Sequence, residues 1–208
     1  MNQNEQRRRT TSLIQGGILI LAACAVTALR PAQAGNSVNL TFRYTVVQGT
    51  CTLNVPATLP MGTIDNPESA VGKNWVFLNP KTLDVTLSDC QGEALATTRP
   101  AIKLTAPVAT SGSADRQKYL ATSATGSSGF GVVIAQKGLA PVTGSVSNLT
   151  PLTSGDAYID LGALNTTAQN GTTTLNVALA CGAAADCAVN NLSAGTDKVS
   201  IRFEFAYH

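Results

Sequence analysis

The 208-residue sequence contains few charged residues, few aromatic residues and a single histidine. Charged residues make up 12% of the chain, about half of the ~25% that is usual for a soluble globular protein. The formal net charge of +2 provides no basic surface of the kind that nucleic acid requires, so no nucleic-acid partner is expected. Catalytic triads and zinc hydrolases rely on histidine, and His208 is the last residue, which we expect to be solvated. We therefore expect neither an enzyme nor a cofactor.

The first 34 residues are typical of a secretory signal peptide. Arginines at positions 7–9 precede an apolar run from Leu13 to Ala28, and Ala32-Gln33-Ala34 provides a cleavage site before Gly35. The apolar run is shorter than the ~20 residues that a membrane span needs. Cleavage removes four of the 14 basic and one of the 12 acidic residues, which leaves 174 residues with 10 basic and 11 acidic side chains. The mature chain is therefore not basic, and we expect it to be exported.

A second interpretation of the N-terminal segment remains open. Leu21-Ala22-Ala23-Cys24 matches a lipoprotein box, which would place a lipid on Cys24 and retain residues 25–34. The chain would then be a lipid-anchored or secreted immunoglobulin-like surface-binding protein. The mature N-terminus distinguishes the two interpretations, because signal cleavage yields Gly35 and lipid anchoring yields an acylated Cys24.

We expect disulfide bonds, because an exported protein reaches an oxidising compartment. Without Cys24, four cysteines remain, and they allow three connectivities: Cys51, Cys90, Cys181 and Cys187. Cys181 and Cys187 flank a short turn-like segment that can close locally, which leaves Cys51 to pair with Cys90. A metal site is disfavoured, because the spacing is not Cys-x2-Cys and the only histidine is the last residue.

The sequence after residue 35 predicts β-strands throughout, since no stretch sustains the 3.6-residue apolar period of a helix. Short runs that alternate apolar and polar residues are separated by clusters of turn-forming residues. The clearest internal runs are Leu83–Leu87, Ile102–Leu104, Val132–Ile134 and Leu175–Leu179. Roughly seven short strands without a dividing linker are typical of a single all-β sandwich. Trp75 is expected in its core rather than in a sugar-binding patch.

Both ends of the mature chain alternate in the same way. The apolar positions near the C-terminus are Val199, Ile201, Phe203, Phe205 and Tyr207. Those near the mature N-terminus are Val38, Leu40, Phe42, Tyr44 and Val46. Period-2 alternation implies one buried face, and a terminal tail is normally polar and frayed, so an apolar tail needs a groove. Periodicity alone leaves open that the two segments pair with each other in a closed sandwich.

Several sequence features occur in a characteristic order. Phe42–Cys51 combines an apolar extension with a cysteine, Leu59–Ile64 is a short motif after it, and Leu83–Cys90 carries a second cysteine. Gly129–Ile134 contains a Gly-x-Gly-apolar strand. Gly195 lies fourteenth from the C-terminus and Tyr207 is penultimate. Together these features, over residues 36–208, resemble the subunits of bacterial chaperone–usher pili of the type 1 kind.

The resemblance implies an incomplete immunoglobulin-like β-sandwich at residues 50–208, a pilin domain that lacks its last strand, after an N-terminal donor-strand extension at residues 35–49. A periplasmic chaperone would bind the C-terminal strand, and the donor extension of a neighbouring pilus subunit would then replace it, a known case of strand addition. Gly195 and the alternating residues from Val199 to Tyr207 would form this site. An outer-membrane usher would assemble the subunit into a fimbrium at the cell surface, and the fimbrium would mediate cell adhesion.

Two features depart from the family pattern. Tyr44 stands where type 1-like donor segments usually carry glycine, so the acceptor groove that this segment fits is an open question. Cys181 and Cys187 form a pair that the simplest pattern lacks. Both departures indicate a divergent or minor subunit, and whether it is a shaft, adaptor or terminating subunit is not specified by the sequence.

Overall fold

The computed structural model describes residues 43, 48–123, 128–153, 155 and 157–208. Apart from Arg43, these residues belong to one compact unit, Tyr44–His208, and Arg43 belongs to a second unit, Met1–Arg43. The expected signal peptide and the five expected donor residues, Val38, Leu40, Phe42, Tyr44 and Val46, lie outside the described residues. No helix in the described ranges is long and apolar enough to cross a membrane.

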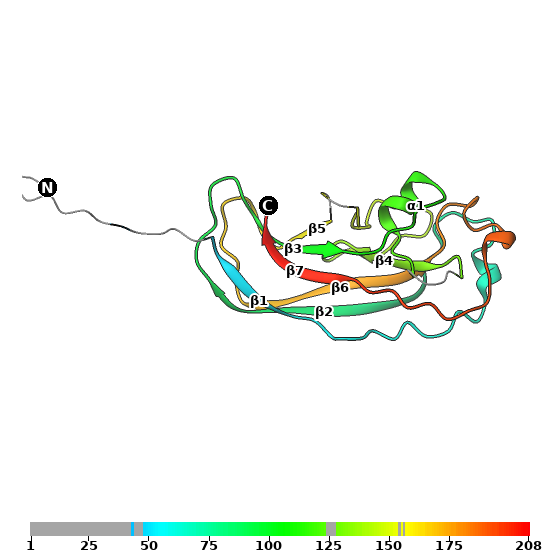
Figure 1. The fold of residues 1–208 in the computed structure, drawn as a ribbon, viewed down its shortest axis with the longest axis horizontal. Coiled ribbons are helices and arrows are strands. Elements are labelled where there is room, and N and C mark those ends of the chain that lie inside the picture. The colour runs from blue at the N-terminus through cyan, green and yellow to red at the C-terminus, as the bar shows by residue number, and fades with distance from the viewer. Residues whose placement is uncertain (1–42, 44–47, 124–127, 154, 156) are drawn as a thin grey trace, which may run out of the picture. The chain divides into compact units, whose positions relative to one another are not determined.

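The described residues form an all-β sandwich of two antiparallel sheets (Figure 1). The first sheet has the order β1 (Thr50–Asn54), β2 (Leu78–Gln91), β6 (Gly171–Ala180), β4 (Gly131–Ala135). The second sheet has the order β5 (Tyr158–Asp160), β3 (Pro100–Thr105), β7 (Arg202–Tyr207). This agrees with the all-β fold and the strand number that the sequence predicts. β1 and β4 are the edge strands of the first sheet, and β5 and β7 are those of the second.

The core lies between the two sheets and follows the period-2 pattern of the sequence. In β2, Leu83, Val85 and Leu87 are buried, while the intervening Asp84 is exposed. Leu83 and Val85 pack in one cluster with residues of the other sheet, among them Ile102 of β3 and Ile159 of β5. Trp75 is 4% exposed and its ring meets the ring of Tyr119 edge to face, so it belongs to a core cluster as expected.

Three helical segments were not anticipated by the alternating pattern. They are α1 (Ala114–Tyr119) and two 3-10 turns, Pro67–Ser69 and Val189–Asn191. The Ser113 hydroxyl caps α1 by accepting a hydrogen bond from the Arg116 backbone N–H. A helix of six residues is too short for a 3.6-residue apolar period to become visible in the sequence.

The second glycine of the Gly-x-Gly motif, at the start of β4, has a steric role. Gly131 starts β4 next to the isolated bridge between Ala121 and Val132. A Cβ atom on Gly131 would collide with the carbonyl oxygen of Ala121 and the side chain of Leu120. Only glycine therefore allows β4 to approach residues 120–121 this closely.

Candidate functional site

Two disulfide bonds are present, Cys51–Cys90 and Cys181–Cys187, with Cα atoms 4.1 and 5.4 Å apart. These are the two pairs that the cysteine spacing predicts. Cys51–Cys90 joins edge strand β1 to β2. Cys181 and Cys187 are fully buried and pack in a cluster with Ala70 and Phe130. The first bond therefore fixes an edge of the sandwich, and the second lies inside a core cluster.

Three aromatic residues of β7, Phe203, Phe205 and Tyr207, point into the sandwich but are not fully covered. Their partners in the β3 register are Leu104, Ile102 and Pro100, whose side chains are buried, with no more than 2% exposed. Directly opposed residues share a face of the sheet, so the aromatic side chains also face inward. All three are nevertheless only half-buried. The inward face of the sandwich is thus incompletely covered along β7.

The facing strand β1 shows the same incomplete burial. Leu53 stands opposite Leu87 of β2, which is 4% exposed, yet Leu53 itself is half-buried. Val55, Leu59 and Met61 follow β1 and are half-buried against the same core. β1 and β7 lie close together and each is the edge of its own sheet, so the two incompletely buried rows lie at neighbouring sheet edges.

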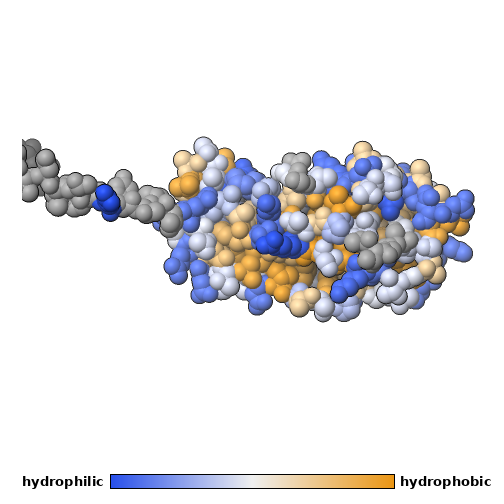
Figure 2. Space-filling view, in the orientation of Figure 1, coloured by the Kyte–Doolittle hydropathy of each residue, from blue (hydrophilic) through white to orange (hydrophobic). Residues whose placement is uncertain are grey.

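We call this apolar strip the seam. It consists of half-buried residues from both edges: Leu53, Val55, Leu59, Met61, Val199, Ile201, Phe203 and Phe205. Hydrophobic residues are visible on the face of the domain along which β1 and β7 run (Figure 2). Apolar side chains that remain half-buried at the edges of a folded domain are candidates for contact with a partner.

Among the described residues, no strand pairs with the outer edge of β7, so its backbone presents an open edge along the seam. The N–H and C=O groups of Arg99 and His208 are hydrogen-bonded to each other at 2.9 and 3.1 Å. Hydrogen-bonded and non-hydrogen-bonded pairs alternate in an antiparallel ladder. In the observed register, the backbone groups of Phe203, Phe205 and Tyr207 therefore point away from β3. The same three residues present inward side chains and outward backbone groups, which is what an added strand requires.

β7 begins later than the alternation of the sequence indicates. The last paired residues are Thr105 of β3 and Arg202 of β7, so Val199 and Ile201 precede the strand. Pro107 follows β3 closely and has no N–H with which to continue the ladder. Val199 and Ile201 still pack against the core from an irregular segment. Gly195 is exposed, and no atom lies within 4 Å of the position of its Cβ, so it does not contribute to the seam.

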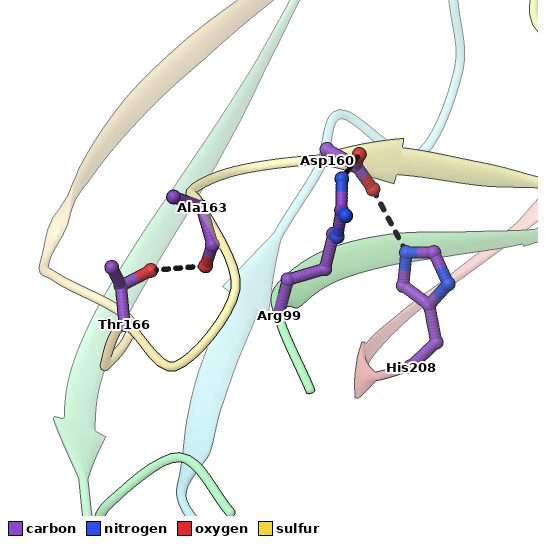
Figure 3. A network of polar contacts seen from close by, with 5 residues as sticks. All are labelled: Arg99, Asp160, Ala163, Thr166 and His208. Atoms are coloured by element: carbon purple, nitrogen blue, oxygen red, sulfur yellow. Dashed lines mark hydrogen bonds and ion pairs between the residues drawn. The ribbon is translucent and has the colours of Figure 1, made fainter. Parts of the chain in front are cut away.

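A polar network at the C-terminal end was not foreseen from the sequence. The Arg99 guanidinium and the Nε2 atom of His208 lie 2.7 and 2.8 Å from the two carboxylate oxygens of Asp160 (Figure 3). The His208 ring also stacks on Tyr158 with 4.1 Å between ring centres. Beside this network, the Thr166 hydroxyl donates to the Ala163 carbonyl at 2.7 Å. His208 is exposed, as expected, but its ring also contacts Asp160 and Tyr158.

The ion pairs in this network predict a loss of stability in acid. Burial raises the pKa of Asp160, whereas hydrogen bonds and charges from His208 and Arg99 lower it. The lowering effects are larger together, so the pKa lies below the ordinary 3.8. The unfolded chain therefore binds the proton first, so the contribution is complete above pH 3.8 and is lost as the pH falls through the lowered pKa. The effect should be small, because the side chains of Arg99 and Asp160 are 34% and 43% exposed.

Urea denaturation of wild type and Asp160→Asn from neutral to strongly acidic pH measures this contribution. The difference in unfolding free energy between the two proteins should shrink as the pH falls. A difference that stays constant across the range would contradict the assignment.

In the part of the chain that the structure describes, no group of three or more His, Cys, Asp or Glu side chains is arranged to hold a metal ion. The sequence matches no family model and no curated protein sequence. Among solved structures, the chain is similar to the P pilus rod subunit PapA, with 16% identity and a TM-score of 0.46. The match covers 83% of this chain and 100% of that chain. At this identity and TM-score the similarity carries no information about function.

Proposed function

We propose that this chain is a structural subunit of a surface fimbrium and polymerises by donor-strand exchange. The observation that carries the proposal is the arrangement of Phe203, Phe205 and Tyr207. They face inward, remain half-buried, and direct their backbone groups toward an open edge. The resemblance of residues 36–208 to chaperone–usher pilus subunits supports the same function. The role is structural rather than catalytic.

The extension at residues 35–49 is the proposed donor strand, and the seam of a neighbouring subunit is its proposed acceptor. Five apolar side chains that alternate along the extension would enter the seam, each worth ~1.5–3 kcal/mol on full burial, for a gross gain near ~10 kcal/mol. Ordering of the extension offsets much of this gain. Main-chain hydrogen bonds to the open edge of β7 would set the register.

Exposure of the seam before assembly explains why partners are needed. An uncovered apolar edge invites unwanted pairing between strands. We propose that a periplasmic chaperone covers the seam after export, and that an outer-membrane usher exchanges it for the extension of the next subunit. The secretory signal pattern of residues 1–34 supports this route to the cell surface, where the fibre would mediate adhesion.

Amide hydrogen exchange tests the proposal at single residues. The mature chain, starting at Gly35, is mixed with a synthetic peptide of residues 36–48. An added strand should protect the amides of Phe203 and Phe205, because their N–H groups point to the open edge. The amides of Glu204 and Ala206 already pair with β3 and should not change. Glu204 and Ala206 thus serve as internal controls.

Two results would contradict the proposal. One is the absence of protection at Phe203 and Phe205 at peptide concentrations well above those of the subunit. The other is equal protection of all four amides, which would indicate general stabilisation rather than strand addition. Mass spectrometry of the mature N-terminus tests the lipid-anchored alternative, which requires an acylated Cys24 instead of Gly35.

A further inference from the structure

The hydroxyl of Tyr207 lies among segments that are distant in sequence. Tyr207 is the last residue of β7, and its ring meets that of Phe205 edge to face at 5.3 Å. Its hydroxyl oxygen accepts a hydrogen bond from the backbone N–H of Ala168 at 3.0 Å. The loop that contains Ala168 is tied in turn to the first disulfide, because the Asn170 side chain accepts from the Cys90 N–H at 2.9 Å. The hydroxyl is therefore held by the loop that precedes β6.

Gly49 is enclosed between this hydroxyl and the turn after β2. A Cβ atom on Gly49 would lie 2.9 Å from the Gln91 carbonyl oxygen and 3.0 Å from the Tyr207 hydroxyl oxygen. On the other side, a Cβ atom on Gly92 would lie 2.7 Å from the Cα of Gly49. The Gly49 N–H donates to the Glu93 carbonyl at 3.1 Å. Such close contacts leave Gly49 no room to shift unless its neighbours shift too.

We propose that Tyr207 is a positioning residue that couples the seam to Gly49, the point at which the donor extension is attached. This inference rests on the proposed function. Tyr207 has its backbone on the open edge of the seam and its hydroxyl against Gly49. A strand added beside β7 fixes the backbone of Tyr207, and the enclosed hydroxyl then steadies Gly49. In a subunit whose seam is filled, Gly49 is therefore less mobile, and the extension that starts there is better positioned to bind the next subunit.

Tyr207→Phe tests the coupling in the mature chain, because it keeps the ring and removes only the hydroxyl. The reporters are the amides of Ala168 and Gly49, which donate to the Tyr207 hydroxyl and the Glu93 carbonyl. Loss of one hydrogen bond should accelerate exchange of both amides by about 10-fold. The amide of His208, which donates to the Arg99 carbonyl, should not change if β7 stays paired. Acceleration at Ala168 alone would overturn the coupling.

Gly49→Ala tests the same contact by changing Gly49 instead of Tyr207. It keeps the proposal testable if Tyr207→Phe does not fold. Its methyl group would press on the hydroxyl, so the Ala168 amide should exchange faster although Tyr207 is intact. Gly171→Ala is the matched control, since no atom lies within 4 Å of its Cβ position at the start of β6. Unchanged exchange of Ala168 in Gly49→Ala would refute the proposal.

The peptide of residues 36–48 separates this inference from the proposed function. In wild type, peptide binding should slow exchange at both Phe203 and Gly49. In Tyr207→Phe, it should slow exchange at Phe203 only. No protection at Phe203 in wild type defeats the proposed function. Protection at Phe203 without any change at Gly49 in wild type defeats the coupling alone.

Discussion

Replacement of Cys51 and Cys90 together by serine is expected to lower the free energy of unfolding by about 4 kcal/mol. The bond closes a sequence separation of 39 residues, for which loop-closure entropy gives about this value. Both cysteines are half-buried, so serine hydroxyls at these positions keep some contact with water and add little penalty. Without the disulfide, β1 should be the strand that detaches most easily, because it is an edge strand paired only with β2 among the described strands.

The second disulfide provides the comparison. Cys181–Cys187 spans only 6 residues, and the same entropy argument gives about 2 kcal/mol. Its sulfur atoms are fully buried, so alanine rather than serine is the appropriate replacement. Because a reductant reaches half-buried sulfur more easily than buried sulfur, Cys51–Cys90 should open first under mild reduction.

Denaturant unfolding of the double-serine variant measures the stability loss, and mass mapping of alkylated cysteines gives the order of reduction. A loss below about 1 kcal/mol would mean that backbone pairing alone holds β1 on β2. Release of Cys181 and Cys187 before the first pair would show that the core cluster around Ala70 and Phe130 opens more readily than the edge.

The features that could be predicted from the sequence are those that rest on local pattern. Alternation at Leu83–Leu87 marks a strand with one buried face, and the structure places these residues in the core of β2. The short spacing between Cys181 and Cys187 limits the disulfide pairing. The inward direction of Phe203 and Phe205 follows from the same period-2 rule, because side chains in a strand alternate between faces.

Features that depend on contacts between distant segments could not be predicted. The start of β7 at Arg202 depends on where its partner β3 ends, not on its own sequence. The pairing of His208 with Asp160 joins residues 48 positions apart, and no local pattern signals it. The contact of the Tyr207 hydroxyl with Ala168 is of the same kind. Incomplete burial of an inward face is likewise a property of the assembled sheets, so alternation cannot distinguish an open sandwich from a closed one.

For the proposed assembly, the largest effect is expected from a single charge in the proposed donor strand or in the seam. An unpaired carboxylate in an apolar groove costs several kcal/mol. Since every 1.4 kcal/mol is tenfold in affinity, Phe42→Asp should weaken donation of the extension by more than ~100-fold. Thr41→Asp is the matched control, because alternation places Thr41 on the opposite face of the extension. It should assemble like wild type.

Phe203→Asp places the same charge on the acceptor side. Its extension remains intact, so this variant should donate a strand but not accept one, whereas Phe42→Asp should accept but not donate. Neither variant should form fibres alone. A mixture should form dimers and nothing longer, because the extension of one variant fills the seam of the other and both remaining ends are defective. Circular dichroism melts of each variant verify that both domains are folded.

The mixing experiment also decides between an open and a closed sandwich. If residues 36–48 filled the seam of their own chain permanently, both charges would act within the monomer. Phe42→Asp and Phe203→Asp would then each lower the melting temperature of the isolated chain, and mixing them would produce no dimer. In the open sandwich the two substitutions act on different molecules, so each defect is rescued by the partner that lacks it. Dimers in the mixture, with little loss of stability in Phe42→Asp, therefore require exchange of the strand between subunits.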